Sequence, residues 1–348
     1  MARIGRSPGM ERRIAWVCQW LDPSLPVKEQ AALNLRDTTV TYLSKLPQKD
    51  AIAKLIGLVQ TNGETLLAQI SRTARLPPGQ RAMRMGSNVL PVYSHPAVRP
   101  LYDDPALKRV VETSLAPAAR AARDGGVRLS MHPGQYTVLA TEKDHTRTAA
   151  VADIEYHTDV MRHLGQAGGW HPNGAHINVH AGGRAAGIEA FRSGLSLLSE
   201  DARNLLTVEN EETAYGLDDL LPLADSLPIV LDLHHHWVVT GEYLEPEDPR
   251  IARVIESWRG VRPIMHISAP KPDLIPGQDP EVLPDRAALI AAGISARDLR
   301  AHSARLWNRP HAAWAARHLA WGDIEVEAKE KNLASAAFAE VCFPVVAA

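Results

Sequence analysis

The chain has 348 residues, 45% of them hydrophobic, and its 38 Lys and Arg residues nearly balance 40 Asp and Glu residues, for a formal net charge of −2. This composition excludes a disordered chain and suits one large domain or two ordinary ones. No apolar run reaches the roughly 18 residues of a membrane-spanning helix, so no membrane partner is expected. The near-neutral charge excludes nucleic-acid binding by bulk positive charge, so any such binding must use a local patch or metal ions.

Both ends of the chain indicate a cytoplasmic protein. The first residues, MARIGRSPGMERRIAWVCQW, are basic and lack the apolar stretch of a secretory signal. Cys18 and Cys342 lie at opposite ends, outside any spacing typical of a metal site. Two such cysteines are typical of a reducing compartment rather than of a disulfide framework.

Short apolar runs alternate with longer Ala/Leu-rich segments along the chain. In order, the runs predict strands at 2–5, 82–91, 127–134, 175–183, 205–212, 228–236, 262–270 and 323–331. The segments between them predict helices at 50–74, 106–123, 151–166, 188–199, 249–259 and 304–319. This alternation is typical of parallel strands joined by crossover helices.

Eight strand–helix units in about 330 residues predict a (β/α)8 TIM barrel, an α/β fold that forms a single domain over residues 1–348. An open doubly wound sheet is disfavoured, because no glycine-rich phosphate-binding motif follows the first strand. The proline-rich segment 269–285 is interpreted as an excursion after the seventh strand, not as a domain boundary.

Side chains that bind metals recur at the C-terminal ends of the predicted strands. They are His95 after strand two, His132, His180, Glu209 and Asp232 at strands three to six, His266 in strand seven and Glu327 in strand eight. An isolated His there is usually a hydrogen-bonded structural residue, whereas a Glu in an apolar run needs a partner, because an unpaired buried carboxylate is costly. Together these side chains lie on the face where barrel enzymes build active sites. The stretch VLDLHHHW, otherwise a solvated turn, is therefore interpreted as part of a metal centre.

His235 and His302 bring the candidate ligands to nine. Imidazole and carboxylate without thiolate suit manganese, iron, zinc or magnesium. Nine ligands exceed the needs of one ion, so we expect two or three ions bridged by carboxylates. Clustered ions are a common device for phosphodiester hydrolysis, in which one activates water and the others neutralise charge on the phosphate.

Short motifs along the chain resemble the ultraviolet damage endonucleases, a barrel family related to the apurinic-site endonucleases of the endonuclease IV type. The motifs occur in the family's order and cover most of the chain from about Asn34 to Asn332. They are NLRD (34–37), MRMGSNVLP (83–91), SHP (94–96), SMHPGQY (130–136), NVHAGG (178–183), VENEE (208–212), LDLHHH (231–236), MHIS (265–268) and VEAKEK (326–331). MHPGQY, VENEE and VEAKEK are the more specific of these motifs.

The resemblance implies a three-metal centre, usually assigned to manganese, in which Glu209 bridges two ions. The other ligands of these two ions would be Asp232, His266 and Glu327 for one, and His132 and His180 for the other. His95, His235 and His302 would bind a third ion, toward which Asp232 reaches. His234 and His236 would then support the site or face solvent.

The resemblance also implies residues that contact DNA. Gln135 and Tyr136 match residues placed to insert at the lesion, where a Tyr ring replaces lost base stacking and a Gln hydrogen-bonds to orphaned bases. On its residues alone, GQY is an ordinary loop after a strand. Lys329 matches a family lysine and is expected to act with Glu209 as a catalytic residue by contacting a phosphate oxygen; a salt bridge to a neighbouring Glu is the alternative.

Two positions depart from the family pattern. Arg6 stands where an aromatic residue followed by Asn is expected after the first strand, which bears on damage recognition. Ile264 stands where the family tends to have a Lys, two residues before the His of strand seven. The chain is also longer than compact bacterial members, with insertions expected at about 46–76 and 270–300, and insertions at a barrel mouth can change the substrate.

The expected function is a metal-dependent DNA repair endonuclease that hydrolyses the phosphodiester 5′ to a photolesion and leaves 3′-hydroxyl and 5′-phosphate ends. Its expected partner is damaged double-stranded DNA, gripped by basic residues such as Arg84, Lys143 and Lys271, with no obligate protein partner and a nucleoid-associated location. One alternative is a multinuclear iron-dependent oxidase of a peptide or small molecule, which Arg6, Ile264 and the near-neutral charge favour. Another is an isomerase or other hydrolase of the xylose-isomerase-like barrels. A binding module without catalysis is disfavoured, because all nine candidate ligands are present.

Overall fold

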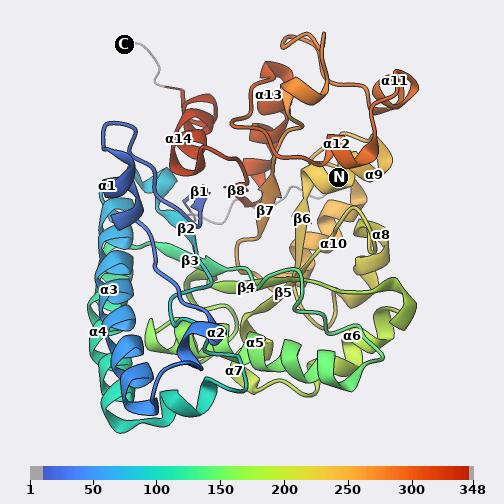
Figure 1. Cartoon of the computed structure of the whole chain (residues 1–348). Helices are drawn as coiled ribbons and strands as arrows, with labels where there is room; N and C mark the ends of the chain where they lie inside the picture. The colour runs from blue at the N-terminus through green and yellow to red at the C-terminus, as the bar shows by residue number, and fades with distance from the viewer. Residues whose placement is uncertain (1–10, 345–348) are drawn as a thin grey trace.

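The computed structural model describes residues 11–344, which form a closed barrel of eight parallel strands (Figure 1). Neighbouring strands follow chain order, and β1 pairs with both β2 and β8 to close the sheet. The strands are β1 (Ile14–Val17), β2 (Ala82–Met85), β3 (Arg128–Met131), β4 (His176–His180), β5 (Leu206–Glu209), β6 (Ile229–Asp232), β7 (Ile264–Ile267) and β8 (Asp323–Val326). The predicted single-domain (β/α)8 barrel is confirmed.

The first strand differs from the prediction. Segment 2–5 lies outside the described residues, and β1 is Ile14–Val17, all four residues of which are buried. Periodicity alone cannot assign so short a run of apolar residues, because a buried strand and a buried helical turn look alike. The correction also moves the segment that follows the first strand, from Arg6, which likewise lies outside the described residues, to Cys18, Gln19 and Trp20.

Helices connect successive strands and surround the barrel (Figure 1). The α-helices are α1 (Val27–Ala32), α2 (Val40–Leu43), α3 (Gln48–Ala74), α4 (Pro105–Gly125), α5 (Asp144–His163), α6 (Ile188–Leu195), α7 (Glu200–Leu205), α8 (Leu217–Leu220), α9 (Leu233–Thr240), α10 (Pro249–Ser257), α11 (Arg286–Ala291), α12 (Ala296–Leu299), α13 (Arg309–Arg317) and α14 (Lys331–Cys342). The 3-10 helices are η1 (Pro78–Gln80), η2 (Arg99–Asp103), η3 (Pro172–Gly174), η4 (Arg184–Ala186), η5 (Leu221–Leu223), η6 (Pro272–Leu274) and η7 (His318–Ala320). Each of the six predicted helices overlaps one of these elements.

The two segments expected as insertions differ in structure. Segment 46–76 contains α3, which connects β1 to β2 and packs along α4 (Figure 1). Gly63 lies where these helices meet, and a Cβ there would be 2.7 Å from the carbonyl oxygen of Ser114, so the close approach depends on glycine. Segment 270–300 contains η6, α11 and α12, which follow β7.

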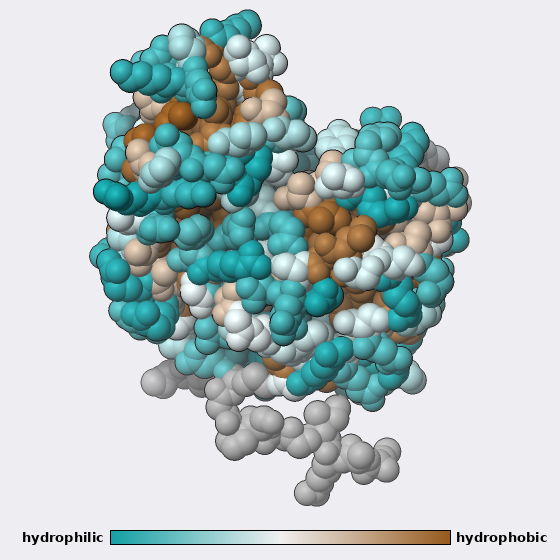
Figure 2. All heavy atoms as spheres, turned by 90° about the horizontal axis from the view of Figure 1, so that it is seen from below, coloured by the Kyte–Doolittle hydropathy of each residue, from teal (hydrophilic) through white to brown (hydrophobic). Residues whose placement is uncertain are grey.

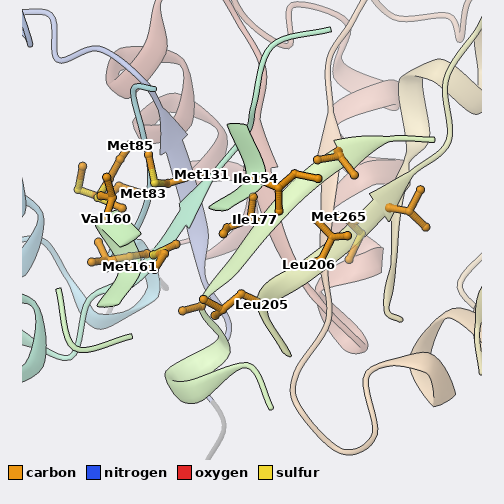
Figure 3. Packing of buried hydrophobic residues seen from close by; sticks show 14 of the residues in the cluster. Met83, Met85, Met131, Ile154, Val160, Met161, Ile177, Leu205, Leu206 and Met265 are labelled. Atoms are coloured by element: carbon orange, nitrogen blue, oxygen red, sulfur yellow. The ribbon is translucent and has the colours of Figure 1, made fainter. Parts of the chain in front are cut away.

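The hydrophobic core lies between the strands and the surrounding helices. Figure 3 shows Met83 and Met85 of β2 in the same cluster as Met131 of β3 and Val160 of α5. Met85 and Met131 are partners in the β2–β3 register. Burying one such side chain contributes about 1.5–3 kcal/mol. This packing fixes the strands, and with them the side chains at the strand ends.

An ion-pair cluster closes the N-terminal end of the barrel, and we call it the floor cluster (Arg128, Arg262 and Asp323). Arg128 Nη1 lies 2.9 Å from Asp323 Oδ2, and Arg262 Nε lies 2.7 Å from Asp323 Oδ1. The backbone N–H of Arg13 also donates to Asp323 Oδ1, at 3.0 Å. The Arg128 guanidinium lies over the ring of Trp258, 5.5 Å from its centroid. Asp323 therefore has partners on both oxygens although it is buried.

None of the helices within residues 11–344 has the length and apolar character needed to cross a membrane. The face seen in Figure 2 is mostly hydrophilic, with apolar residues gathered in separate patches.

Candidate metal centre

Six of the nine candidate ligands, those carried by the strands or following them directly, meet at the C-terminal end of the barrel, where His235 and His302 also approach them. The six are His132 after β3, His180, Glu209 and Asp232 at the ends of β4, β5 and β6, His266 in β7 and Glu327 after β8. Parallel strands in a barrel all end on the same face, so residues at these positions share one site.

Glu209 is fully buried at the centre of this group. Its Oε2 lies 3.0 Å from His132 Nε2 and 3.6 Å from His180 Nε2. Its Oε1 lies 3.0 Å from His266 Nδ1 and 3.6 Å from His235 Nδ1. The two oxygens thus face two different sets of imidazoles, which is the arrangement a bridging carboxylate needs.

Two sets of side chains could each hold a metal ion. One is His132, His180 and Glu209, and the other is Glu209, Asp232 and His266; within each set the ligand atoms lie within 4.8 Å of one another. Glu209 belongs to both sets. Imidazole and carboxylate ligands without thiolate suit manganese, iron, zinc or magnesium.

The buried charges of this site depend strongly on one another. Burial, followed by Glu209 and Glu327, raises the pKa of Asp232 to about 7 against the influence of His235. Burial alone would lower the pKa of His266, but Glu209 and two other carboxylates raise it well above its usual value. Asp232 Oδ2 is buried with no hydrogen-bond partner among the described residues. The cluster therefore has carboxylate oxygens and imidazoles that suit bound cations.

The VLDLHHHW stretch turns from strand into helix at Asp232. Asp232 ends β6 and caps α9, and its Oδ1 accepts the backbone N–H of His235 at 2.6 Å. The ring Nδ1 of His235 lies 3.0 Å from the carbonyl oxygen of Asn210, which can only accept, so Nδ1 carries the proton and Nε2 is left free to bind a cation. One tight turn thus brings Asp232 and His235 to the same site.

The other two histidines of the triplet are buried, so of the two alternatives, supporting the site or facing solvent, the second is excluded. His234 stacks on Trp237, with ring centroids 6.1 Å apart, and lies 5.7 Å from the His302 ring. His236 Nε2 lies 3.1 Å from Glu242 Oε2. His234 thus reaches the site through its contact with His302, and His236 is held by Glu242.

Glu327 connects the cluster to Arg84 and His302. Its Oε1 lies 2.6 Å from Arg84 Nη1 and 3.2 Å from His266 Nδ1. Its Oε2 lies 3.7 Å from His302 Nδ1. Arg84 was expected to contact DNA phosphates, but it is buried and paired with carboxylates, so that expectation is wrong for this residue. Of the other two basic residues expected to contact DNA, Lys143 is exposed and Lys271 is half-buried.

His95 lies apart from the other candidates. It is exposed on the loop between β2 and η2, and its Nδ1 accepts the backbone N–H of Ala97 at 3.2 Å. Within residues 11–344 its ring forms no hydrogen bond or ion pair with another candidate ligand, so its role as a ligand stays a prediction.

The residues expected to contact DNA are exposed. Tyr136 is 83% exposed, and Gln135 is exposed beside it on the loop after β3. Lys329 is exposed after β8, and it forms no ion pair within the described part of the chain, so the alternative of a salt bridge to Glu325 or Glu327 is not observed.

Sequence reasoning missed three residues that hold the site. Asn178 donates to Glu209, and Asn210 donates to the carbonyl oxygen of Asp232 at 2.9 Å. Glu325 contacts His266 from below. Asn178 and Glu325 each lie two residues before a candidate ligand on the same strand, so the period of two that puts both side chains on one face was the available signal.

The structure also bears on the two departures from the family pattern, at Arg6 and Ile264. The segment after the true first strand contains Gln19, which is exposed, and Trp20, whose ring packs edge-on against Trp16 at 5.3 Å. An aromatic and an amide side chain therefore do follow β1. Ile264 is buried in a small apolar cluster with Val230 and Trp258.

A closed eight-stranded barrel with His, Asp and Glu side chains gathered at the C-terminal ends of its strands defines the class, a TIM barrel with a candidate metal centre. The family model of the UV-endonuclease UvdE matches residues 16–341. The chain therefore belongs to the UV-endonuclease UvdE family.

Individual relatives agree with this membership. A UV-damage endonuclease of Neurospora crassa is 31% identical over 207 residues, which span 55% of this chain and 31% of that protein. A UV DNA damage endonuclease of Bacillus cereus strain B4264 is 25% identical over 311 residues, or 85% of each chain. The crystal structure of SacUVDE has a TM-score of 0.72 at 17% identity and covers 95% of this chain and 98% of that one. That likeness supports the fold.

Proposed function

We propose that the protein is a metal-dependent DNA repair endonuclease that hydrolyses the phosphodiester 5′ to ultraviolet photolesions in double-stranded DNA. Membership of the UV-endonuclease family and relatives named UV DNA damage endonuclease support this activity. The observation that carries it is Glu209, a single buried carboxylate shared by two sets of candidate ligands. Paired metal sites are a common device for phosphodiester hydrolysis.

The side chains fit divalent cations, and Mn²⁺ is the proposed metal. The proposed ligands are Glu209, Asp232, His266 and Glu327 for one ion, His132 and His180 with Glu209 for a second, and His95, His235 and His302 for a third. The orphaned Oδ2 of Asp232 supports a cation at the first position. When bound, such ions supply the Lewis acidity that lowers the pKa of a water nucleophile and neutralises charge on the phosphate.

The protein's own residues orient the ligands and bind the DNA. Asn178 and Arg84 hold Glu209 and Glu327 in place. Lys329 is exposed at the same end of the barrel, which supports the proposal that it contacts a phosphate oxygen. Cleavage would leave a 3′-hydroxyl and a 5′-phosphate, and a cytoplasmic, nucleoid-associated location without an obligate protein partner fits this role.

Tyr136 and Gln135 are proposed to recognise the lesion. The ring of Tyr136 is 83% exposed on a loop and is therefore available to stack on a base, an interaction worth about 1–3 kcal/mol. We expect Tyr136→Ala to weaken cleavage of irradiated duplex by about tenfold or more, which corresponds to about 1.4 kcal/mol, while Tyr136→Phe keeps most activity. Tyr42→Ala, at another exposed tyrosine, is the control. Equal activity of Tyr136→Ala and wild type would contradict this role.

The alternative of a multinuclear iron-dependent oxidase loses one of its supports. Arg6 does not follow the first strand, and the segment that does contains Gln19 and Trp20. Ile264 and the near-neutral charge remain compatible with either chemistry.

A nicking assay tests the proposal. Purified protein with Mn²⁺ is given end-labelled duplex, irradiated or not, beside Glu209→Gln and the control Glu112→Gln, whose side chain is exposed on α4. Cleavage of irradiated duplex alone by wild type and Glu112→Gln, without need for oxygen, is the expected result. If protein that binds Mn²⁺ cuts neither duplex, the endonuclease proposal fails, and oxygen consumption by the iron-loaded protein becomes the next measurement.

A further inference from the structure

A fourth buried carboxylate lies beneath the candidate ligands. Glu325 is fully buried in the middle of β8 and is the register partner of His266 on β7. Its Oε2 lies 3.2 Å from His266 Nε2, close enough for an ion pair but without the alignment of a hydrogen bond. The other ring nitrogen of His266, Nδ1, lies 3.0 Å from Glu209 Oε1 and 3.2 Å from Glu327 Oε1. The imidazole therefore stands between Glu325 on one side and the candidate metal ligands on the other.

Glu325 is itself held from two directions. The buried hydroxyl of Ser130 on β3 donates to its Oε1. Arg84 Nη1 lies 3.5 Å from its Oε2 and 2.6 Å from Glu327 Oε1, so one guanidinium joins Glu325 and Glu327. A carboxylate without contact to water is expensive unless such partners compensate its charge. Arg84 and His266 offset the charge of Glu325 and Ser130 donates to its Oε1, although its Oε2 has no hydrogen-bond partner among the described residues.

Resting on the metal centre of the proposed function, we infer that Glu325 is a positioning residue for His266. With a small rotation of the ring, Glu325 would accept the Nε2–H of the imidazole, so that the proton stays on Nε2 and the lone pair of Nδ1 is available to the cation that Glu209, Asp232 and Glu327 would hold. Carboxylate–histidine–metal arrangements of this kind fix the tautomer and the ring orientation, and they make the imidazole a better ligand. Two glutamates that lie two residues apart thus have different proposed roles: Glu327 would bind the ion, and Glu325 orients His266.

Three variants separate this role from a merely structural one. Glu325→Leu removes the acceptor, whereas Glu325→Gln keeps an oxygen that can accept from Nε2. Asp323→Asn is the matched control, because Asp323 is a buried carboxylate of the same strand that is paired in the floor cluster. Mn²⁺ is titrated into each metal-free protein by calorimetry, bound Mn²⁺ is counted by elemental analysis, and the thermal midpoint of the metal-free form is recorded.

We expect Glu325→Leu to bind Mn²⁺ about 10- to 100-fold more weakly at one site, as other losses of such supporting carboxylates do. Glu325→Gln should recover most of that affinity, and Asp323→Asn should bind as wild type does even if its thermal midpoint falls. If Glu325→Leu does not fold, a weaker affinity of Glu325→Gln than of Asp323→Asn still supports the role.

Other outcomes overturn the inference. Wild-type affinity in Glu325→Leu, or an equal loss in Asp323→Asn, makes Glu325 structural only. Loss of one bound ion in both Glu325 variants makes it a direct ligand. A wild-type protein that binds Mn²⁺ and shows this pattern but does not nick DNA leaves the inference standing while the endonuclease proposal fails; a wild type that binds no Mn²⁺ ends both.

Discussion

The two ends of the barrel both bury charged groups, but they balance them differently. At the floor cluster, Arg128 and Arg262 contact the two oxygens of Asp323 at 2.9 and 2.7 Å. At the opposite end, Glu325 and Glu327 share the single guanidinium of Arg84. The other positive charges there are protonated imidazoles such as His266, whose pKa the neighbouring carboxylates raise. At the floor each oxygen of Asp323 has a cationic partner, although Arg128 Nη2 has no hydrogen-bond partner among the described residues. At the other end the carboxylates outnumber the one guanidinium, an arrangement that suits added cations. Burial alone therefore does not mark a functional site; incomplete compensation does.

The largest effect on the contrast between the two ends is expected from Glu209→Gln. It removes the charge that both sets of candidate ligands share, and metal ions supply several kcal/mol of transition-state stabilisation in such sites, so cleavage should fall by about 100- to 1000-fold. Single-turnover cleavage of irradiated duplex measures the loss, and elemental analysis should show fewer bound Mn²⁺ ions. An active Glu209→Gln variant would show that Glu209 is not the bridging group.

Asp323→Asn in the floor cluster should have the opposite effect: it should lower stability and leave Mn²⁺ binding unchanged. Asp323→Asn leaves the buried Arg128 and the partly buried Arg262 without their carboxylate, and breaking a buried pair in this way costs about 3–5 kcal/mol. Urea unfolding of the metal-free protein measures that cost. Mn²⁺ affinity should stay within about twofold of wild type, because the floor contacts none of the candidate ligands. A large drop in affinity would erase the distinction between the two ends.

A third test uses alkaline pH and the metal-free protein. Burial alone would lower the pKa of His235, but Asp232 and Glu209 raise it to about 9. A pKa raised in the folded state stabilises the fold fully below the unfolded pKa of about 6.5, and that contribution is lost as pH rises toward 9. The thermal midpoint in chelator should therefore fall between these pH values, and His235→Asn or saturating Mn²⁺ should reduce the decline. A profile identical in wild type and His235→Asn would count against this coupling.

The smallest expected effect is the acid counterpart near the floor. Burial lowers the pKa of His171 to about 3, although a hydrogen bond to the carbonyl oxygen of Ala175 opposes it. A depressed folded pKa means that stability is present above about pH 6.5 and is lost as pH falls toward 3. His171→Asn, which tolerates the left-handed backbone at φ 43°, should lessen the fall in midpoint between pH 6.5 and 4. Added Mn²⁺ should not alter the difference between the two proteins.

Much of the fold could be predicted because the pattern repeats. Seven of the eight predicted strands overlap observed strands, because each contains a short apolar run, and six of them carry a candidate ligand or directly precede one. The failure was β1, where IAWV carries no alternation and no metal-binding side chain at its end. The correction affects function, because it removes Arg6 as evidence against lesion recognition.

The candidate site could be predicted in part for the same reason. Strand ends brought six ligands together, but the position of His95 depends on a loop, and loop conformation has no comparable periodic signal. Arg84 was placed at the DNA surface because a basic side chain near a strand end looks the same whether it is exposed or paired. Only the three-dimensional contacts show that Arg84 forms ion pairs with both Glu325 and Glu327.

Asp232 uses its two oxygens for two different purposes. Oδ1 holds the backbone N–H of His235 at the start of α9, and Oδ2 has no hydrogen-bond partner among the described residues. A cation bound to Oδ2 would restrict the rotation of the carboxylate and so keep Oδ1 on that amide. The exchange of the His235 amide proton with deuterium should therefore slow when the centre is loaded, which makes one helix cap a reporter of metal occupancy that needs no substrate.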